Sequence, residues 1–374
     1  MSRLRVVGLI LTVALLGLLS LSAVSACGGL FCQNVPVDQQ AERIIFTVNP
    51  DSTITAYVQI NYTGSSTDFS WVVPVPSVPK VDVAEIATFD ELSMLTSPVF
   101  IAPLMPPCAP IPMPMAASAN DAAGAGGGVQ VLASGTAGPY AYNVVTSVDP
   151  NAMINWLRSN NYRITEEMEP LIKVYTDEQM DFLAMKLRPE QGVQDIQPIA
   201  MTYNGKQPMI PLRLTAVAAT PNMNVITWVF GNAQALPTNY AHPAIQNDDI
   251  RGTFFTSDGT NYLQLVDQTV DLYSGRAFIT EYAEPTSALK SQTIDPLLQK
   301  LFSDYGYVTR VFGRISPEEM TVDPVFKLSS DVSDVTNVHD LSKMDQKVFW
   351  GCSDVEQPPI NIQYDPNVVP PDFQ

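Results

Sequence analysis

Histidine, the most common general base in enzymes, is almost missing from this sequence. Only His242 and His339 occur among 374 residues. The chain also lacks the Gly-x-Ser-x-Gly elbow of serine hydrolases and the His-Glu-x-x-His pattern of zinc proteases. We therefore interpret both histidines as surface or capping residues and predict no histidine-based catalytic site.

Basic residues are also few. Lys and Arg number 20 against 38 Asp and Glu, which gives a net charge of −18. Such a chain repels phosphate backbones, so we expect no nucleic-acid partner. Acidic groups such as Asp248 with Asp249, or Asp331, Asp334 and Asp340, leave calcium open. However, the alternating Asp-x-Asp-x-Asp-Gly spacing of a calcium loop is absent, and we predict no metal and no other cofactor.

Matches to other catalytic motifs are isolated. Residues 287–290 and 77–80 both fit Ser-x-x-Lys, but the Ser-Asp-Asn and Lys-Thr-Gly partners of that motif do not occur. Glu166, Glu167 and Glu169 resemble the carboxylates of glycoside hydrolases, although an exposed acidic turn explains them equally simply. No catalytic residue is predicted from these patterns.

Long hydrophobic runs are limited to one, at the N-terminus. Arg3 and Arg5 precede an apolar stretch, and the small residues Val24, Ser25 and Ala26 precede Cys27. This pattern predicts a signal peptide over residues 1–26, cleaved before Cys27. Two alternatives remain: a lipobox that makes Cys27 a lipidated first residue, or an uncleaved N-terminal helix. All three place the protein outside the cytoplasm, either secreted or attached to the cell envelope, with possible membrane attachment through the N-terminus.

The four cysteines fit an oxidising compartment. Cys27, Cys32, Cys108 and Cys352 allow three pairings into two disulfides. We favour Cys27 with Cys32, which are close in sequence, and Cys108 with Cys352, which would close a long loop. If Cys27 carries lipid, Cys32 needs another partner or stays free.

Alternating hydrophobic residues predict a fold of the α+β class, mainly antiparallel β-sheet with several packed helices. In residues 53–60 the apolar side chains occupy every second position, so one face should meet a core and the other water. The turn at 49–52 would pair this strand with 44–48. In the strand at 69–75, alternation places Phe69, Trp71, Val73 and Val75 on one face. Pro74 and Pro76 place this strand at an edge or an end. Further strands are predicted at 182–187, 196–203, 212–218, 225–230 and 307–312.

Helix signals are fewer. Thr88 and Glu91 form a capping-box pattern before a short helix at 89–95, and Asp149 with Pro150 marks the start of another. The clearest amphipathic pattern runs from Ile294 to Tyr305. Ser316 and Glu319 form a second capping box.

Several sequence blocks together resemble the bacterial domain-of-unknown-function 2330 family. The first is Cys-Gly-Gly-Leu-Phe-Cys at 27–32, and shorter matches lie at 37–39, 156–157, 161–162 and 309–310. The remaining blocks are Ala-Glu-Arg-Ile at 41–44, Phe-Ser-Trp-Val-Val-Pro-Val-Pro at 69–76, Pro-Leu-Arg-Leu-Thr at 211–215 and Met-Thr-Val-Asp-Pro-Val-Phe at 320–326. The resemblance implies an exported bacterial protein whose activity is not established, and it supplies no catalytic residues. Some relatives carry a C-terminal membrane helix, whereas this chain ends in Pro-Pro-Asp-Phe-Gln.

We therefore divide the chain into three parts. Residues 1–26 are the signal peptide or anchor, and 27–356 form the domain that resembles the family. Residues 103–139, rich in Pro, Ala and Gly, are expected to be a flexible insertion, and residues 357–374 a loose tail.

The sequence favours a non-catalytic envelope or secreted protein that binds an unidentified extracellular partner or has a structural role. One alternative is an extracellular hydrolase whose carboxylates are brought together by folding. Another is a calcium-stabilised adhesin-like module. Two carboxylates, or a carboxylate and a histidine, converging in a deep apolar cleft would favour the hydrolase.

Overall fold

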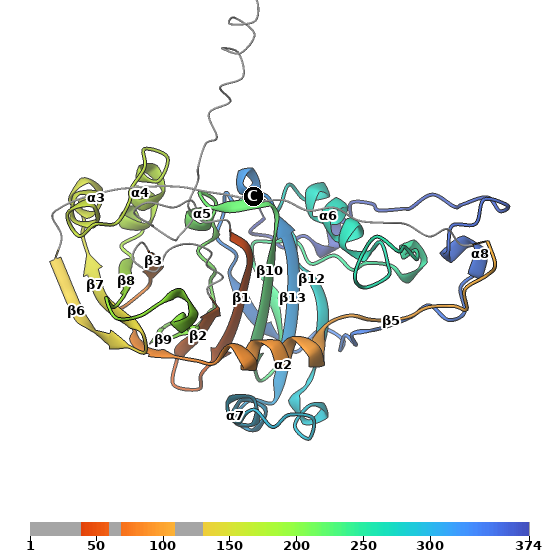
Figure 1. Ribbon diagram of the computed structural model, residues 1–374, viewed down its shortest axis with the longest axis horizontal. Helices are drawn as coiled ribbons and strands as arrows, with labels where there is room; N and C mark the ends of the chain where they lie inside the picture. The colour runs from red at the N-terminus through yellow and green to blue at the C-terminus, as the bar shows by residue number, and fades with distance from the viewer. Residues whose placement is uncertain (1–38, 60–68, 109–129, 374) are drawn as a thin grey trace, which may run out of the picture.

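Two sheets form the body of the protein (Figure 1). The computed structural model describes residues 39–59, 69–108 and 130–373. The larger sheet has the strand order β12-β13-β10-β1-β2-β9-β4 and the smaller sheet the order β3-β8-β7-β6. Only the β1–β10 pair within these two sheets is parallel, so the expected α+β class with mainly antiparallel sheet is confirmed.

The larger sheet consists of β1 (Gln39–Val48), β2 (Thr53–Gln59), β4 (Lys80–Val83), β9 (Ile199–Asn204), β10 (Ala219–Gly231), β12 (Ile279–Pro285) and β13 (Tyr307–Ile315). The smaller sheet consists of β3 (Ser70–Val75), β6 (Gln130–Ala137), β7 (Tyr140–Thr146) and β8 (Asp181–Leu187).

Both faces of the larger sheet are covered, because successive side chains of a strand point to opposite faces. On β1, Ile44 and Phe46 belong to the main core, whereas Ile45 joins a second core under α2 and α7. The expectation that the second face of β2 meets water is therefore wrong: Tyr57 packs against the second core. Two helices lie on the second core, α2 (Ile86–Thr96) and α7 (Pro296–Asp304), while the main core includes side chains of α3 (Pro150–Ser159), α4 (Glu169–Asp177) and α6 (Tyr262–Leu272).

Helix starts follow local side-chain chemistry. The Asp149 carboxylate accepts a hydrogen bond from the Asn151 backbone and begins α3 as expected, and Asp295 does the same for α7 through Leu298. The start of α2 differs from the prediction. Glu85 occupies the N-cap position, and the Thr88 hydroxyl donates to the Asp295 carboxylate at 2.9 Å, so Thr88 links α2 to α7 instead of capping α2.

Three expectations about irregular segments are wrong. Residues 130–137, expected to be part of a flexible insertion, form the edge strand β6. Gly135 lies opposite Tyr142 of β7, and the Tyr142 ring occupies the space beside it. Residues 212–218 do not form a strand, because Leu212–Thr215 is the short helix α5. The tail from 357 is not loose: the Arg276 guanidinium lies 4.3 Å from the Phe373 ring centroid, and Tyr364 packs on Tyr273.

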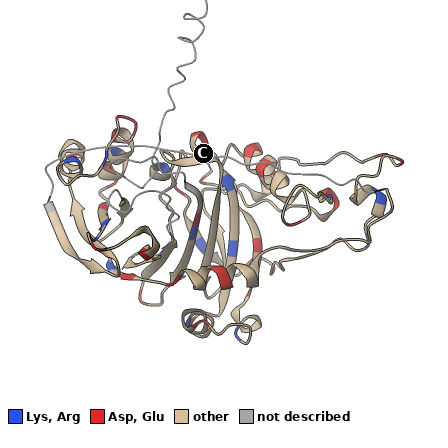
Figure 2. Ribbon diagram, viewed as in Figure 1, with Lys and Arg blue, Asp and Glu red and all other residues tan. Residues whose placement is uncertain are grey.

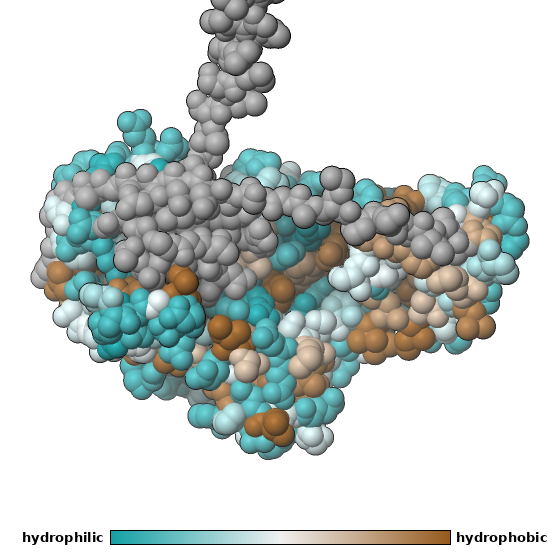
Figure 3. Space-filling model, viewed as in Figure 1, coloured by the Kyte–Doolittle hydropathy of each residue, from teal (hydrophilic) through white to brown (hydrophobic). Residues whose placement is uncertain are grey.

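An arm extends from the larger sheet (Figure 1). It contains the parallel strands β5 (Val99–Ile101) and β15 (Val338–Asp340) and the short helix α8 (Gln346–Phe349). Phe100 stacks on His339 on the covered face, whereas Val99 and Ile101 are exposed, and Figure 3 shows hydrophobic side chains along the lower edge of this arm. Two further strands, β11 (Gln234–Pro237) and β14 (Phe326–Ser329), pair beside the larger sheet.

Candidate functional site

A pocket lies where the edge of the smaller sheet meets the larger one. It has a volume of about 330 Å³ and is lined by residues of β1, β2 and β9 of the larger sheet and of β3 of the smaller. β3 is an edge strand, as Pro74 and Pro76 predicted. Among the described strands, β3 has a neighbour on one side only, β8, and the pocket lies beside it.

The wall of this pocket is almost entirely apolar. Trp71 and Val73 alternate on β3 so that both face inward, as the sequence pattern predicted. The mouth carries polar groups, since Lys206 and Gln207 are exposed and lie at the rim. The main apolar side chains of the wall are Phe46, Val58, Trp71, Val73, Met201 and Tyr203.

One carboxylate interrupts the apolar wall. Glu42 on β1 is 5% exposed, and its Oε2 accepts a long hydrogen bond of 3.5 Å from the Thr215 hydroxyl of α5. Burial raises the pKa of Glu42 to about 7, the Thr215 bond lowers it and the nearby Asp323 carboxylate raises it further. Glu42 therefore titrates near neutrality.

Asp323 is held in a polar network beside the pocket. Its Oδ1 accepts from the Tyr175 hydroxyl and from the Arg213 backbone, both at 2.9 Å. Its Oδ2 accepts from Arg213 Nε at 2.8 Å and lies 2.6 Å from Arg213 Nη2. The same guanidinium also pairs with Glu178. Burial raises the pKa of Asp323, while the Arg213 bonds lower it.

The two carboxylates differ in their surroundings. Three hydrogen bonds and an ion-pair contact join Asp323 to Arg213 and Tyr175, and Asp323 does not line the pocket, whereas Glu42 does. Neither His242 nor His339 lines the pocket. The His242 backbone donates to Val368, and the ring of His339 lies 2.7 Å from Asn247 Oδ1 in the arm.

The other residues that sequence motifs singled out lie apart from the pocket. Ser77 and Lys80 flank an extended segment, with Lys80 starting β4. Ser287 and Lys290 are exposed, and Glu169 pairs with Arg158 at 2.5 Å. The predicted signal peptide, Cys27 and Cys32 lie outside the described residues.

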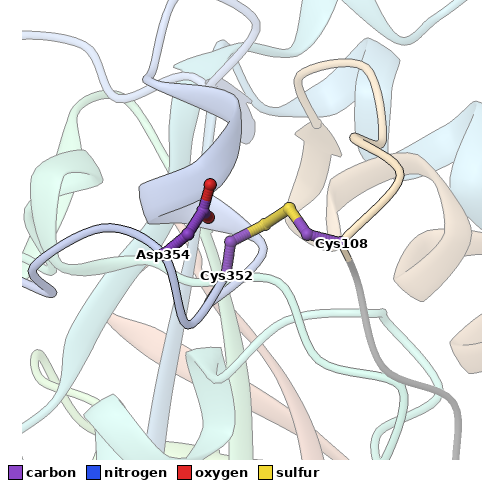
Figure 4. Close-up of side chains that lie close together, drawn as sticks. All are labelled: Cys108, Cys352 and Asp354. Atoms are coloured by element: carbon purple, nitrogen blue, oxygen red, sulfur yellow. A yellow bond between two sulfur atoms is a disulfide. The ribbon is translucent and has the colours of Figure 1, made fainter.

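A second cluster of chemically interesting groups lies at the arm. In the described part of the chain, the group of three with metal-ligand geometry is Cys108, Cys352 and Asp354 (Figure 4), and it includes none of the calcium candidates. The two sulfurs form a disulfide, with a Cα–Cα distance of 5.5 Å. This Cys108–Cys352 bridge is one of the two pairings that we favoured from the sequence. Metal ligation by cysteine requires a thiolate, and Asp354 pairs with Lys347, so we assign the cluster a structural role.

Removal of this disulfide should destabilise the protein. The bridge joins positions 244 residues apart, and Trp350 Nε1 donates to Pro103 beside it. We expect a Cys108→Ser/Cys352→Ser variant to lose about 2–5 kcal/mol of unfolding free energy. Urea denaturation of the wild type and the variant measures this, and an unchanged midpoint would show that the bridge does not restrain the chain.

The basic residues of the described part of the chain are spread over several elements. In the view of Figure 2, Lys and Arg residues are scattered singly over helices and strands. Among the described residues no helix has the length and apolar character needed to cross a bilayer.

Comparison with known proteins places the chain in a family. The model of DUF2330, described as an uncharacterized protein conserved in bacteria, matches residues 21–327. The chain belongs to this family. No curated protein and no solved structure matches it.

Four of the blocks that resemble DUF2330 converge at the pocket. The block at 41–44 supplies Glu42 and Ile44, and the block at 69–76 supplies the β3 wall. The block at 211–215 supplies Pro211 and Thr215, and the block at 320–326 supplies Asp323 and Val325. Glu42 was not predicted as a site residue. The pattern that could have identified it is the alternation of Glu42, Ile44 and Phe46, which places all three side chains on the same face of β1.

Proposed function

We propose that this DUF2330 protein is a non-catalytic extracytoplasmic binding protein whose ligand is a small, mostly apolar molecule held between the two sheets. The observation that carries the proposal is the apolar pocket of about 330 Å³ with one buried carboxylate. Binding sites for small molecules commonly have volumes of roughly 300–1,000 Å³, apolar walls and a few placed polar groups. Glu42 is the polar group that would orient the ligand, and Thr215 contacts Glu42 from α5.

The extracytoplasmic location is supported by two features. The pattern of residues 1–26 is typical of an export signal. The Cys108–Cys352 disulfide is of the kind that persists in oxidising compartments. A hydrolase receives no comparable support, since Asp323 is fully engaged by Arg213 and Tyr175.

Filling the pocket tests the proposal. Ala56 on β2 is buried and lines the pocket, so Ala56→Leu should extend a larger side chain into it. We expect the wild type to bind the uncharged apolar dye N-phenyl-1-naphthylamine with enhanced fluorescence, and Ala56→Leu to weaken binding at least about tenfold, because overlapping atoms cannot share the space.

The matched control is Ala87→Leu, the same change at an exposed position of α2. It should bind the dye as the wild type does. Melting temperatures of both variants confirm that they fold. Absence of dye binding by the folded wild type, or equal binding by Ala56→Leu, would contradict the proposed function.

A further inference from the structure

The buried carboxylate of the pocket defines a chemical class for its ligand. We propose that the ligand carries a primary or secondary amine and that this amine binds as an ammonium ion beside Glu42. The inference rests on the proposed function and makes it more specific.

Glu42 lacks a cationic partner within the described residues. No Lys or Arg there forms an ion pair with it. The Thr215 contact, at 3.5 Å, is at the long limit of a hydrogen bond. A buried carboxylate without a cation is costly, and an ammonium group offers both positive charge and several N–H donors.

The neighbouring cations are committed elsewhere. Arg43 follows Glu42 on β1 and therefore points to the opposite face, where it pairs with Asp90 at 2.7 Å. Arg213 is engaged by Asp323 and Glu178. Lys206 lies at the exposed rim of the pocket. Glu42 is thus the acidic residue of a pocket whose walls are otherwise apolar up to the rim.

The charged and titratable groups around Glu42 reinforce this selectivity. Asp323 adds a second negative charge, which Arg213 partly offsets. The Tyr175 hydroxyl is bound to Asp323, and burial raises the pKa of Tyr203 in the pocket wall above its ordinary value, so both phenols stay neutral. A bound cation would be attracted to Glu42, whereas a ligand carboxylate would be repelled by it once Glu42 ionises.

A matched pair of fluorescent probes tests the inference. 2-(1-Naphthyl)ethylamine and 2-(1-naphthyl)ethanol have nearly the same shape and differ in charge. By isothermal titration calorimetry at pH 8, we expect the wild type to bind the amine about 10- to 100-fold more tightly than the alcohol, because hydrogen bonds between charged groups are the stronger ones. Glu42→Gln should bind both probes with similar affinity.

The pH dependence provides a second measurement. Burial gives Glu42 a pKa of about 7, so below that pH its proton must leave before the ammonium can pair. The amine affinity of the wild type should therefore fall about 8- to 20-fold between pH 8 and pH 5.5, while the alcohol affinity changes little.

Glu85→Gln is the matched control, because it removes an exposed carboxylate that does not line this pocket. It should keep the preference for the amine. Equal binding of the two probes by the wild type would overturn the amine inference and leave the proposed function standing. If neither probe nor N-phenyl-1-naphthylamine binds, the proposed function itself fails. An amine preference retained in Glu42→Gln would overturn the role of Glu42.

Discussion

Replacing Glu281 with leucine is expected to lower the free energy of unfolding by about 3–5 kcal/mol. Glu281 Oε2 lies 2.6 Å from Arg310 Nε, and these side chains are 1% and 6% exposed. Glu281 Oε1 accepts from the Tyr262 hydroxyl at 3.0 Å. Removal of the carboxylate would leave the Arg310 charge buried, with hydrogen bonds to the neutral Ser93 and Ser97 hydroxyls and the Trp228 ring beside it, and no anionic partner among the described residues.

Chemical denaturation of the full chain measures this loss. Asp304→Leu is the matched control, because it removes the carboxylate of an exposed ion pair with Lys300 and should cost less than about 1 kcal/mol. A Glu281→Leu/Arg310→Leu variant should regain part of the stability, since it leaves no uncompensated charge. A loss in Glu281→Leu no larger than that of the control would show that solvent reaches Arg310.

The parts of the fold that the sequence predicted are those with local causes. The Asp149 carboxylate accepts from the Asn151 backbone at the start of α3, and the Glu319 carboxylate accepts from the Ser316 backbone three positions earlier. The alternation in β3 follows from strand geometry and correctly placed Trp71 on the inward face. The hairpin of β1 and β2 formed where turn residues separate two apolar runs.

The wrong predictions concern segments whose structure depends on distant partners. Residues 212–215 have strand-like composition, but Asp323, more than a hundred positions away, binds the Arg213 backbone and side chain and holds a helical turn. β6 is stabilised through backbone pairing with β7, which composition does not encode. The tail is ordered through Tyr273 and Arg276, which no local pattern links to it.

The candidate site shows the same division. The alternation of Glu42 with Ile44 and Phe46 was sufficient to place an acid on the inward face of β1. The sequence did not show that β3 would cover that face incompletely, or that Thr215 and Asp323 would lie beside Glu42. Those contacts join four separate blocks and arise only when the two sheets pack.

Stability measured against pH should expose the cost of burying Glu42. Its pKa in the folded protein, about 7, is higher than the ordinary value of 4.5 that applies when the chain unfolds. The stabilisation linked to the protonated form is therefore fully present below about pH 4.5 and is lost as the pH rises through 7. Glu42→Gln resembles the protonated form at every pH. We expect the variant to match the wild type near pH 4 and to exceed its unfolding free energy by about 2–3 kcal/mol at pH 8.

Urea denaturation at pH 4, 6 and 8 measures this difference, with Glu85→Gln as the control that should show no such trend. A difference that stays constant with pH would mean that Glu42 is not held in a poorly solvated site. Saturating 2-(1-naphthyl)ethylamine should narrow the gap at pH 8, because an ammonium ion would stabilise ionised Glu42 in the wild type and has no carboxylate to pair with in the variant. Stability and ligand selectivity would then depend on the same buried charge. Ionised Glu42 lowers the stability of the ligand-free protein, and the same carboxylate would favour binding of the amine.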